Sequence, residues 1–283
     1  MTAVTLNSNR VAIQGERGSF SDEAARRMLG RREQVLSCAT FPEAFQQLHR
    51  GAAARLVIPI ENTLAGSVHE NYDLLLEHGF WVERELNLRI RHMLIAPRGV
   101  RLAGVKKVYS HPVALAQCRR FFATHPHLAA VADYDTAGSV KRIVADGRRD
   151  AAAIAGPFAA TAYGARIIAR NLEDHAGNFT RFLLIRRYRV ARPVPACDKT
   201  SLVFATKNIP GALFRCLAAF ALRDINLTKL ESRPWRGRPF EYLFYLDFVG
   251  RPDRPPGRQA LAHLAEYTSS VRVLGCYPRH RGE

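Results

Sequence analysis

The chain has 283 residues, of which 47% are hydrophobic and 24% are charged, and its formal net charge is +17. This composition supports a folded protein of roughly one to three domains, and no apolar run reaches the length of a membrane span. The charge suggests nucleic-acid binding, but the 42 basic residues are mostly Arg and lie along the whole chain, without basic runs or interleaved aromatic residues. We therefore expect neither nucleic acid nor a membrane as a partner, although a basic protein attracts small anions.

The five cysteines are scattered, and no two of them form a C-x-x-C pair. The first residues also lack the basic segment and the long apolar stretch of a secretory signal. We therefore expect reduced thiols in a cytoplasmic protein, with neither a disulfide set nor a metal site. The pair Gly15 and Gly18 lacks the third glycine of a dinucleotide-binding fingerprint, so no cofactor is predicted.

In the first two thirds of the chain, predicted strands alternate with predicted helices. Apolar runs predict the strands, and apolar residues at helical spacing predict the helices between them. The expected elements are strand 10–15, helix 19–29, strand 54–60, helix 66–79, extended segment 81–97, strand 106–110, helix 111–125, strand 130–135, helix 136–147, strand 150–156, helix 157–164 and strand 178–188. In such α/β folds, ligands bind where strands end and helices begin.

A linker and a second pattern follow. Residues 186–200 contain prolines and charges without periodicity, which predicts a linker. The expected elements after it are strand 200–206, helix 209–224, strand 225–234, strand 240–250, helix 257–269 and strand 271–278. The order βαββαβ predicts a ferredoxin-like module, in which an open antiparallel sheet carries two helices on one face.

Clusters of small and polar residues follow the predicted strands of the first part. They are residues 15–21, 59–63, 110–112 with Gln117, 135–139 and 178–182. Free backbone N–H groups, hydroxyls and amides at such places can bind a carboxylate. Each cluster also has a purely structural reading, because Ser21, Ser110 and Thr136 can be helix N-caps and the glycines can serve a tight turn. Since all the clusters lie at one edge of one predicted domain, we expect an anion site there.

These clusters resemble the motifs of the prephenate dehydratase family. The matching stretches are "GERGSFS", "PIENTLAGSV" followed by "NYDLL", "YSHPVALAQC", "DTAGS" and, most specifically, "NFTRF". Downstream, "PGALF" and "LRDINLTKLESRP" resemble the ACT regulatory domain of that family. The resemblance implies a two-lobed α/β catalytic domain at 8–190, built like a type II periplasmic binding protein, and an α+β ferredoxin-like ACT domain at 198–280. No chorismate mutase segment is seen before it, so we expect a monofunctional enzyme. Val113 departs from the family, whose members commonly have Gln at that position.

The activity that the resemblance implies is the decarboxylative dehydration of prephenate to phenylpyruvate, CO2 and water in L-phenylalanine biosynthesis. Relatives that use arogenate share the same motifs, so an arogenate dehydratase that forms phenylalanine directly is an alternative. A catalytically inactive amino-acid sensor is a second alternative. A periplasmic binding protein is disfavoured, because it would need a signal peptide and has no use for a regulatory module.

The resemblance also implies roles for individual residues. Thr180 assists the departing hydroxyl, the amides of Asn62 and Gln117 contact the substrate, and Ser110 and Thr136 hold its carboxylates. The other implied substrate-binding residues are Gly18, Ser19, Ser21, Glu61, Arg181 and Phe182. Arg181 alternates with Thr180 along the strand, so it either clamps a carboxylate or pairs with Glu61 or Asp174. Asn178 is expected to shape the turn before the strand.

For the second domain, the resemblance implies feedback regulation by L-phenylalanine in a homodimer or homotetramer. The implied effector-binding residues are Pro210, Gly211, Ala212, Leu213, Asn226, Leu227, Glu231, Ser232, Arg233 and Pro234. An oligomerisation module without a ligand is the alternative for this part. Neither a metal nor a cofactor is implied.

Overall fold

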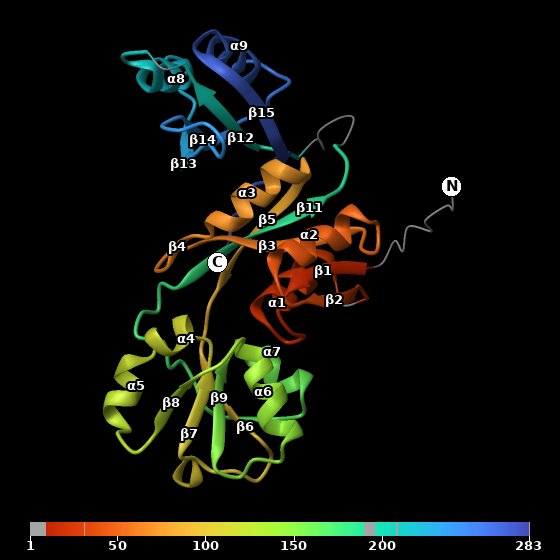
Figure 1. The fold of residues 1–283 in the computed structure, drawn as a ribbon, viewed down its shortest axis with the longest axis vertical. Helices are drawn as coiled ribbons and strands as arrows, with labels where there is room; N and C mark the ends of the chain where they lie inside the picture. Colours follow the sequence, from red (N-terminus) through yellow and green to blue (C-terminus); the bar gives the residue numbers. More distant parts are fainter. Residues whose placement is uncertain (1–9, 31, 190–195, 208, 283) are drawn as a thin grey trace. The chain divides into compact units, whose positions relative to one another are not determined.

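The computed structural model describes residues 10–30, 32–189, 196–207 and 209–282 (Figure 1). They form two units, the first made of the described residues up to His78 together with Leu86–Leu184, and the second of Gly79–Glu85 together with the described residues from Ile185 onward. Part of the predicted linker, at 190–195, and the predicted start of the first domain at residue 8 lie outside the described residues. The division at 8–190 and 198–280 stays a prediction.

The first unit contains two sheets, and one of them carries the N-terminal strands. Its elements are β1 (Arg10–Gln14), α1 (Phe20–Leu29), β2 (Gln34–Cys38), α2 (Phe41–His49), β3 (Arg55–Asn62), β4 (Gly66–Ser67), α3 (His69–His78), the later part of β5 (Trp81–Arg89), and β11 (Phe179–Arg186). The strand order is β5-β11-β3-β1-β2, with β1 parallel to both of its neighbours. Val11, Val57 and Leu184 belong to the apolar core that α1 covers.

The other sheet of the first unit lies in the middle of the chain. Its elements are β6 (Met93–Ala96), the short 3-10 helix η1 (Leu102–Gly104), β7 (Lys107–Ser110), α4 (Pro112–Ala116), α5 (Arg119–Thr124), β8 (Ala129–Ala132), α6 (Thr136–Ala145), β9 (Ala151–Ala155), α7 (Pro157–Ala162) and β10 (Arg166–Ala169). The strand order is β10-β6-β9-β7-β8. The chain passes from the first sheet to this one after β5 and returns after β10 (Figure 1), so the mixed α/β fold that the sequence predicts is present, and it contains two sheets.

The structure also differs from the sequence-based elements in the first unit. The sequence did not predict β2 or β10, which are short, and it also missed α2, although Ala44, Phe45 and Leu48 of that helix are buried at helical spacing. The single helix expected at 111–125 is two helices, because α4 ends at Gln117 and α5 begins after Cys118. The carboxylate of Asp174 accepts hydrogen bonds from the backbone N–H groups of Arg119 and Arg120, at 2.9 and 3.0 Å, and so starts the new helix.

The second unit has the predicted order βαββαβ. Its elements are β12 (Lys199–Thr206), α8 (Ala212–Ala221), β13 (Leu227–Pro234), β14 (Tyr242–Val249), α9 (Gly257–Tyr267) and β15 (Thr268–Tyr277). The antiparallel strand order is β13-β14-β12-β15. Alternate residues of β12 and β14, such as Leu202 and Phe248, share one core with Phe220 of α8 and Leu264 of α9, which places both helices on the same face.

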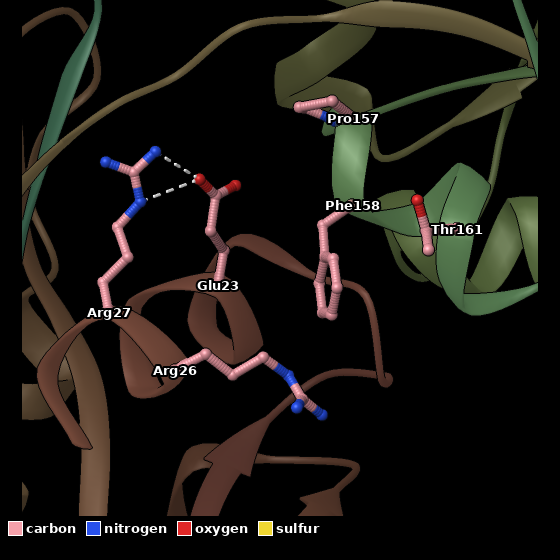
Figure 2. A pocket seen from close by; sticks show the side chains of 6 residues that line it. All are labelled: Glu23, Arg26, Arg27, Pro157, Phe158 and Thr161. Atoms are coloured by element: carbon pink, nitrogen blue, oxygen red, sulfur yellow. Dashed lines mark hydrogen bonds and ion pairs between the residues drawn. The ribbon is translucent and has the colours of Figure 1, made fainter. Parts of the chain in front are cut away.

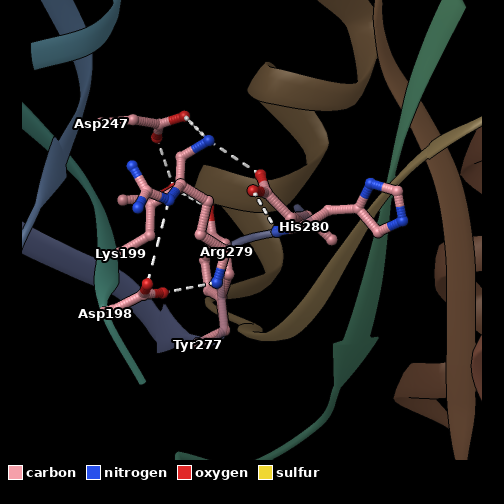
Figure 3. A network of polar contacts seen from close by, with 8 residues as sticks. Asp198, Lys199, Asp247, Tyr277, Arg279 and His280 are labelled. Carbon is pink, nitrogen blue, oxygen red and sulfur yellow. Dashed lines mark hydrogen bonds and ion pairs between the residues drawn. The ribbon is translucent and has the colours of Figure 1, made fainter. Parts of the chain in front are cut away.

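A buried ionic cluster holds segment 79–85 in the second unit (Figure 3). The ammonium of Lys199 lies 2.8 Å from a carboxylate oxygen of Glu85 and 3.7 Å from Asp247, and the side chains of all three are at most 8% exposed. The backbone N–H of His280 donates to Glu85 at 3.0 Å. Charges removed from water in this way are stable only as a complete set, so each partner is needed to keep the others buried.

All five cysteines are buried, and none of them forms a disulfide. The sulfur atoms of Cys197 and Cys276 are nevertheless in contact, at 2.6 Å, and burial raises the pKa of Cys276 to about 12. None of the helices in the described parts of the chain combines the length and the apolar character that crossing a membrane requires.

Candidate active site

A cavity of about 530 Å³ lies in the first unit, a volume typical of small-molecule sites. Its walls come from the end of β1 and the start of α1, the end of β3, residues 90 and 92 after β5, α4, the start of α6, and β11. The residues predicted from the sequence that line it are Ser19, Ser21, Asn62, Gln117, Thr136, Thr180 and Phe182. Val113, at the position that departs from the family, also lines it.

Other predicted residues lie elsewhere. The hydroxyl of Ser110 is fully buried and donates to the backbone carbonyl of Ile154 at 2.6 Å, which ties β7 to β9. Gly18 packs against α7, where an added Cβ would lie 2.9 Å from the Cα of Ala159. Glu61 and Arg181 do not line the cavity, and each has a polar or electrostatic partner.

Ser21, Ser110 and Thr136, which the sequence offered as possible helix N-caps, are not the N-caps in the structure. Ser19 caps α1, with its hydroxyl accepting from the N–H of Asp22, and His111 caps α4. Asp135 caps α6, with Oδ1 accepting from the N–H of Gly138 at 2.6 Å. The hydroxyls of Ser21 and Thr136 therefore stand in the first turns, on the side of the cavity.

The side-chain amide of Asn62 sets the direction of the hydrogen bonds around Thr180. Its Oδ1 accepts from the backbone N–H groups of Leu64 and Ala65, at 2.9 and 2.8 Å, which identifies the other amide atom as the nitrogen. That nitrogen donates to Asn178 Oδ1 at 2.7 Å and to Thr180 Oγ1 at 2.9 Å. Because the Thr180 hydroxyl accepts from Asn62, its single proton remains for another acceptor. The Thr180 side chain lines the cavity, so that acceptor can be a ligand.

A second set of bonds orients Gln117. Its carbonyl oxygen accepts from Asn178 Nδ2 at 2.9 Å and lies 2.9 Å from Nε2 of His92. Since a carbonyl oxygen cannot donate, Nε2 of His92 carries the proton. Burial lowers the pKa of His92, which is only 2% exposed, so the ring is neutral there. Both lone-pair directions of the Gln117 oxygen are therefore occupied, and its NH2 group is left to serve as a donor.

Sequence reasoning missed two members of this network. His92 lies in a stretch that was expected only to be extended, and a lone histidine there belongs to no cluster. Asn178 was expected to shape a turn, but it also joins the Asn62 amide to the Gln117 amide. Its position inside "NFTRF", two residues before Thr180, was the signal that could have identified it.

The cavity walls carry little charge. Among the described residues that line it, none is Lys or Arg, and Asp135 is the only acidic one. Burial raises the pKa of Asp135, and the nearby carboxylate of Glu16 acts in the same direction. Burial, together with Glu16 and Asp135, also raises the pKa of Tyr134 to about 12, so its phenol remains protonated at neutral pH. Neutral donors thus supply most of the polar contacts available to a ligand.

A second, smaller cavity of about 380 Å³ is lined by residues of α1 and α7 (Figure 2). Its charged groups are already engaged with one another. Arg27 pairs with Glu23 at 2.7 Å, and the guanidinium of Arg26 lies 5.1 Å from the ring centre of Phe158 while pairing with Asp22 at 2.8 Å. The contact of Arg26 with Phe158 joins the two helices, and we assign no ligand to this cavity.

Comparison with known proteins places this geometry in context. The family model described as prephenate dehydratase matches residues 11–189. The chain is 44% identical to arogenate dehydratase/prephenate dehydratase 2, chloroplastic, of Arabidopsis thaliana, over 95% of this chain and 72% of that protein. It is 43% identical to arogenate dehydratase 2 of Petunia hybrida, over 96% and 72% of the two chains.

Solved structures are similar over nearly the whole chain. The structure described as GqqA, a novel type of quorum quenching acylases, superposes with a TM-score of 0.89 at 34% identity and covers 96% of this chain and 98% of that one. Prephenate dehydratase from Arthrobacter aurescens in complex with L-Phe superposes with a TM-score of 0.86 at 30% identity, over 95% and 90% of the two chains.

The comparison also corrects the expected location. The sequence analysis expected a cytoplasmic protein, but similar proteins from Arabidopsis thaliana are named as chloroplastic. The cytoplasmic location is therefore wrong by this comparison. The sequence features used for it, scattered cysteines and the absence of a recognisable secretory signal, do not distinguish one reducing compartment from another.

Proposed function

Because the chain belongs to the prephenate dehydratase family, we propose that it removes the ring carboxylate and the ring hydroxyl from a cyclohexadiene substrate, and that this substrate is arogenate in preference to prephenate. The names of the similar plant proteins favour arogenate, with phenylalanine as the product. The motifs alone favoured prephenate, with arogenate as the alternative, and the similar plant proteins favour that alternative.

The reaction needs positioning and one well-placed donor. The bond from the ring to the carboxylate breaks and releases CO2, its electron pair enters the ring, and the bond to the hydroxyl breaks as the ring becomes aromatic. The departing oxygen takes up negative charge and a proton, so a donor aimed at it lowers the barrier. The Thr180 hydroxyl is that donor. Its oxygen accepts a hydrogen bond from the Asn62 nitrogen, so its own proton is left for the substrate oxygen.

The remaining polar groups of the cavity bind the substrate. The NH2 group of Gln117 and the hydroxyls of Ser21 and Thr136 donate to carboxylate oxygens, and the N-terminus of α6 contributes its positive dipole end. Neutral donors suit a reaction in which a carboxylate leaves as uncharged CO2, because they do not hold the starting carboxylate as strongly as an arginine would.

One observation carries the proposal: the hydrogen-bond direction that makes Thr180 a donor into the cavity. The test is to assay purified protein with arogenate and with prephenate, following phenylalanine and phenylpyruvate. Thr180→Val keeps the side-chain shape without the hydroxyl and should lower kcat by about 100- to 1,000-fold. Thr180→Ser keeps the hydroxyl and should retain most of the rate. Equal rates for wild type and Thr180→Val would refute the role of this hydroxyl, and a wild type inactive on both substrates would favour the amino-acid sensor.

For the second unit, we propose an ACT regulatory domain that binds L-phenylalanine and assembles into a homodimer or homotetramer. The support is the βαββαβ order with β13 at the edge of its sheet, and a similar structure that contains L-Phe. The proposed site lies at the start of α8, where Gly211 has a φ of 73°, and along Asn226 and the first and last residues of β13. Calorimetric titration with phenylalanine tests the binding, and light scattering with and without it tests the assembly. Absence of heat would leave the oligomerisation module without a ligand.

A further inference from the structure

We propose that the carboxylate of Asp135 selects the substrate by pairing with an ammonium group, which arogenate carries and prephenate lacks. The inference rests on the proposed function, and it names the residue that separates its two candidate substrates. Arogenate has an amino group where prephenate has a keto group. The two molecules otherwise present the same ring, the same ring hydroxyl and two carboxylates, so discrimination between them requires a group that responds to a positive charge.

Asp135 is placed to be that group. It is the only acidic side chain among the described residues that line the cavity, and no Lys or Arg lines it. An ammonium entering the cavity therefore finds one opposite charge, and a substrate with two carboxylates and no ammonium finds only repulsion from it. The charge of this residue then favours arogenate and disfavours prephenate at the same time.

The two oxygens of Asp135 have different surroundings. Oδ1 accepts from the Gly138 N–H and caps α6. Oδ2 lies toward the end of β1, where a Cβ added to Gly15 would approach it to 3.0 Å. Gly15, with a φ of +99°, thus leaves the space that this oxygen occupies. The carboxylate can hold the helix with one oxygen and present the other to a ligand.

Helix capping alone does not account for a charged residue here. Ser, Thr and Asn cap helices about as well as Asp without bringing a charge into a partly desolvated site. The carboxylate of Glu16 opposes the charge of Asp135 but is itself paired with Lys141 at 3.0 Å. Among the described residues, Asp135 has no Lys or Arg partner. Asp135 is half-buried, and His111, which also lines the cavity, is the one basic side chain whose charge acts on it. A partly desolvated carboxylate in a cavity, close to another acid and without a Lys or Arg partner, is a candidate for a functional role.

The test uses the full chain and two substrates. Asp135→Asn and Asp135→Ser keep an N-cap and remove the charge. We expect kcat/KM for arogenate to fall about 10- to 100-fold, the effect of losing a hydrogen bond to a charged group, while kcat/KM for prephenate stays the same or rises. The ratio of the two constants is the measured quantity, since a loss of folding or of general activity lowers both.

Asp133→Asn is the matched control. Asp133 lies two residues away and pairs with Arg142 at 2.8 Å, but it does not line the cavity, so its loss should leave the ratio unchanged. If both Asp135 variants lower the two constants equally, or lower neither, the proposal is overturned while the dehydratase function stands. If the wild type acts on neither substrate, the proposed function and this inference fall together.

Discussion

Asn62→Asp reverses one hydrogen bond at the centre of the site while keeping the shape of the side chain. In the wild type, the two N–H groups of the Asn62 amide donate to Asn178 Oδ1 at 2.7 Å and to Thr180 Oγ1 at 2.9 Å, and the Phe179 carbonyl lies 3.1 Å from the same nitrogen. A carboxylate oxygen in the same place cannot donate to any of them. The Thr180 proton then turns toward the new carboxylate and away from the substrate.

The expected magnitudes follow from these contacts. Loss of the donor to Thr180 should lower kcat by about 100- to 1,000-fold, the effect of removing one donor to a developing oxyanion. The two lost hydrogen bonds, at about 1 kcal/mol each, should lower the free energy of unfolding by about 2 kcal/mol. Steady-state kinetics and urea titration measure the two effects on the same sample.

The pH dependence of this variant has a defined sign. Only the protonated form of the introduced carboxyl has a proton to donate toward Asn178 and Thr180. The rate of the variant, relative to the wild type, should therefore rise as the pH falls through the pKa of this carboxyl. Asn71→Asp is the control, because the buried Asn71 nitrogen donates to the Pro59 carbonyl at 2.7 Å and has no contact with Thr180. If Asn62→Asp keeps a wild-type kcat at neutral pH, the proposed hydrogen-bond direction is wrong.

Two further predictions concern stability. Lys199→Ala leaves the buried carboxylates of Glu85 and Asp247 without their cation, and should lower the free energy of unfolding by about 3–5 kcal/mol in a urea titration; a loss below about 1 kcal/mol would show that the cluster is accessible to water. Because burial lowers the pKa of His92, the unfolded chain binds its proton more readily than the folded one, so folding stability should fall as the pH drops below about 6.5. His92→Leu should show a smaller fall than the wild type over that range, and identical slopes for the two proteins would contradict the neutral ring.

Much of the fold could be predicted because its signals are local. The buried strand β9, "AAAIA", and the βαββαβ order of the second unit follow from apolar runs and helical spacing within short windows. The missed strand β2 pairs along one side only, with β1, and only its last residue is buried, so its apolar pattern is weak. The break between α4 and α5 depends on Asp174, which lies more than fifty residues further along the chain, and no local pattern records it.

By itself, the sequence determined which chemical groups are available and in which motifs they stand: the Thr180 hydroxyl in "NFTRF", the Asn62 amide at the end of β3 and the Gln117 amide just after α4. The tertiary structure decided what each group does. The backbone of Leu64 and Ala65 orients the Asn62 amide, and contacts between distant segments turn the Ser110 hydroxyl toward β9 and bring His92 to Gln117. A hydrogen bond has a direction that depends on where its partners lie in space, and residue order alone does not specify that direction.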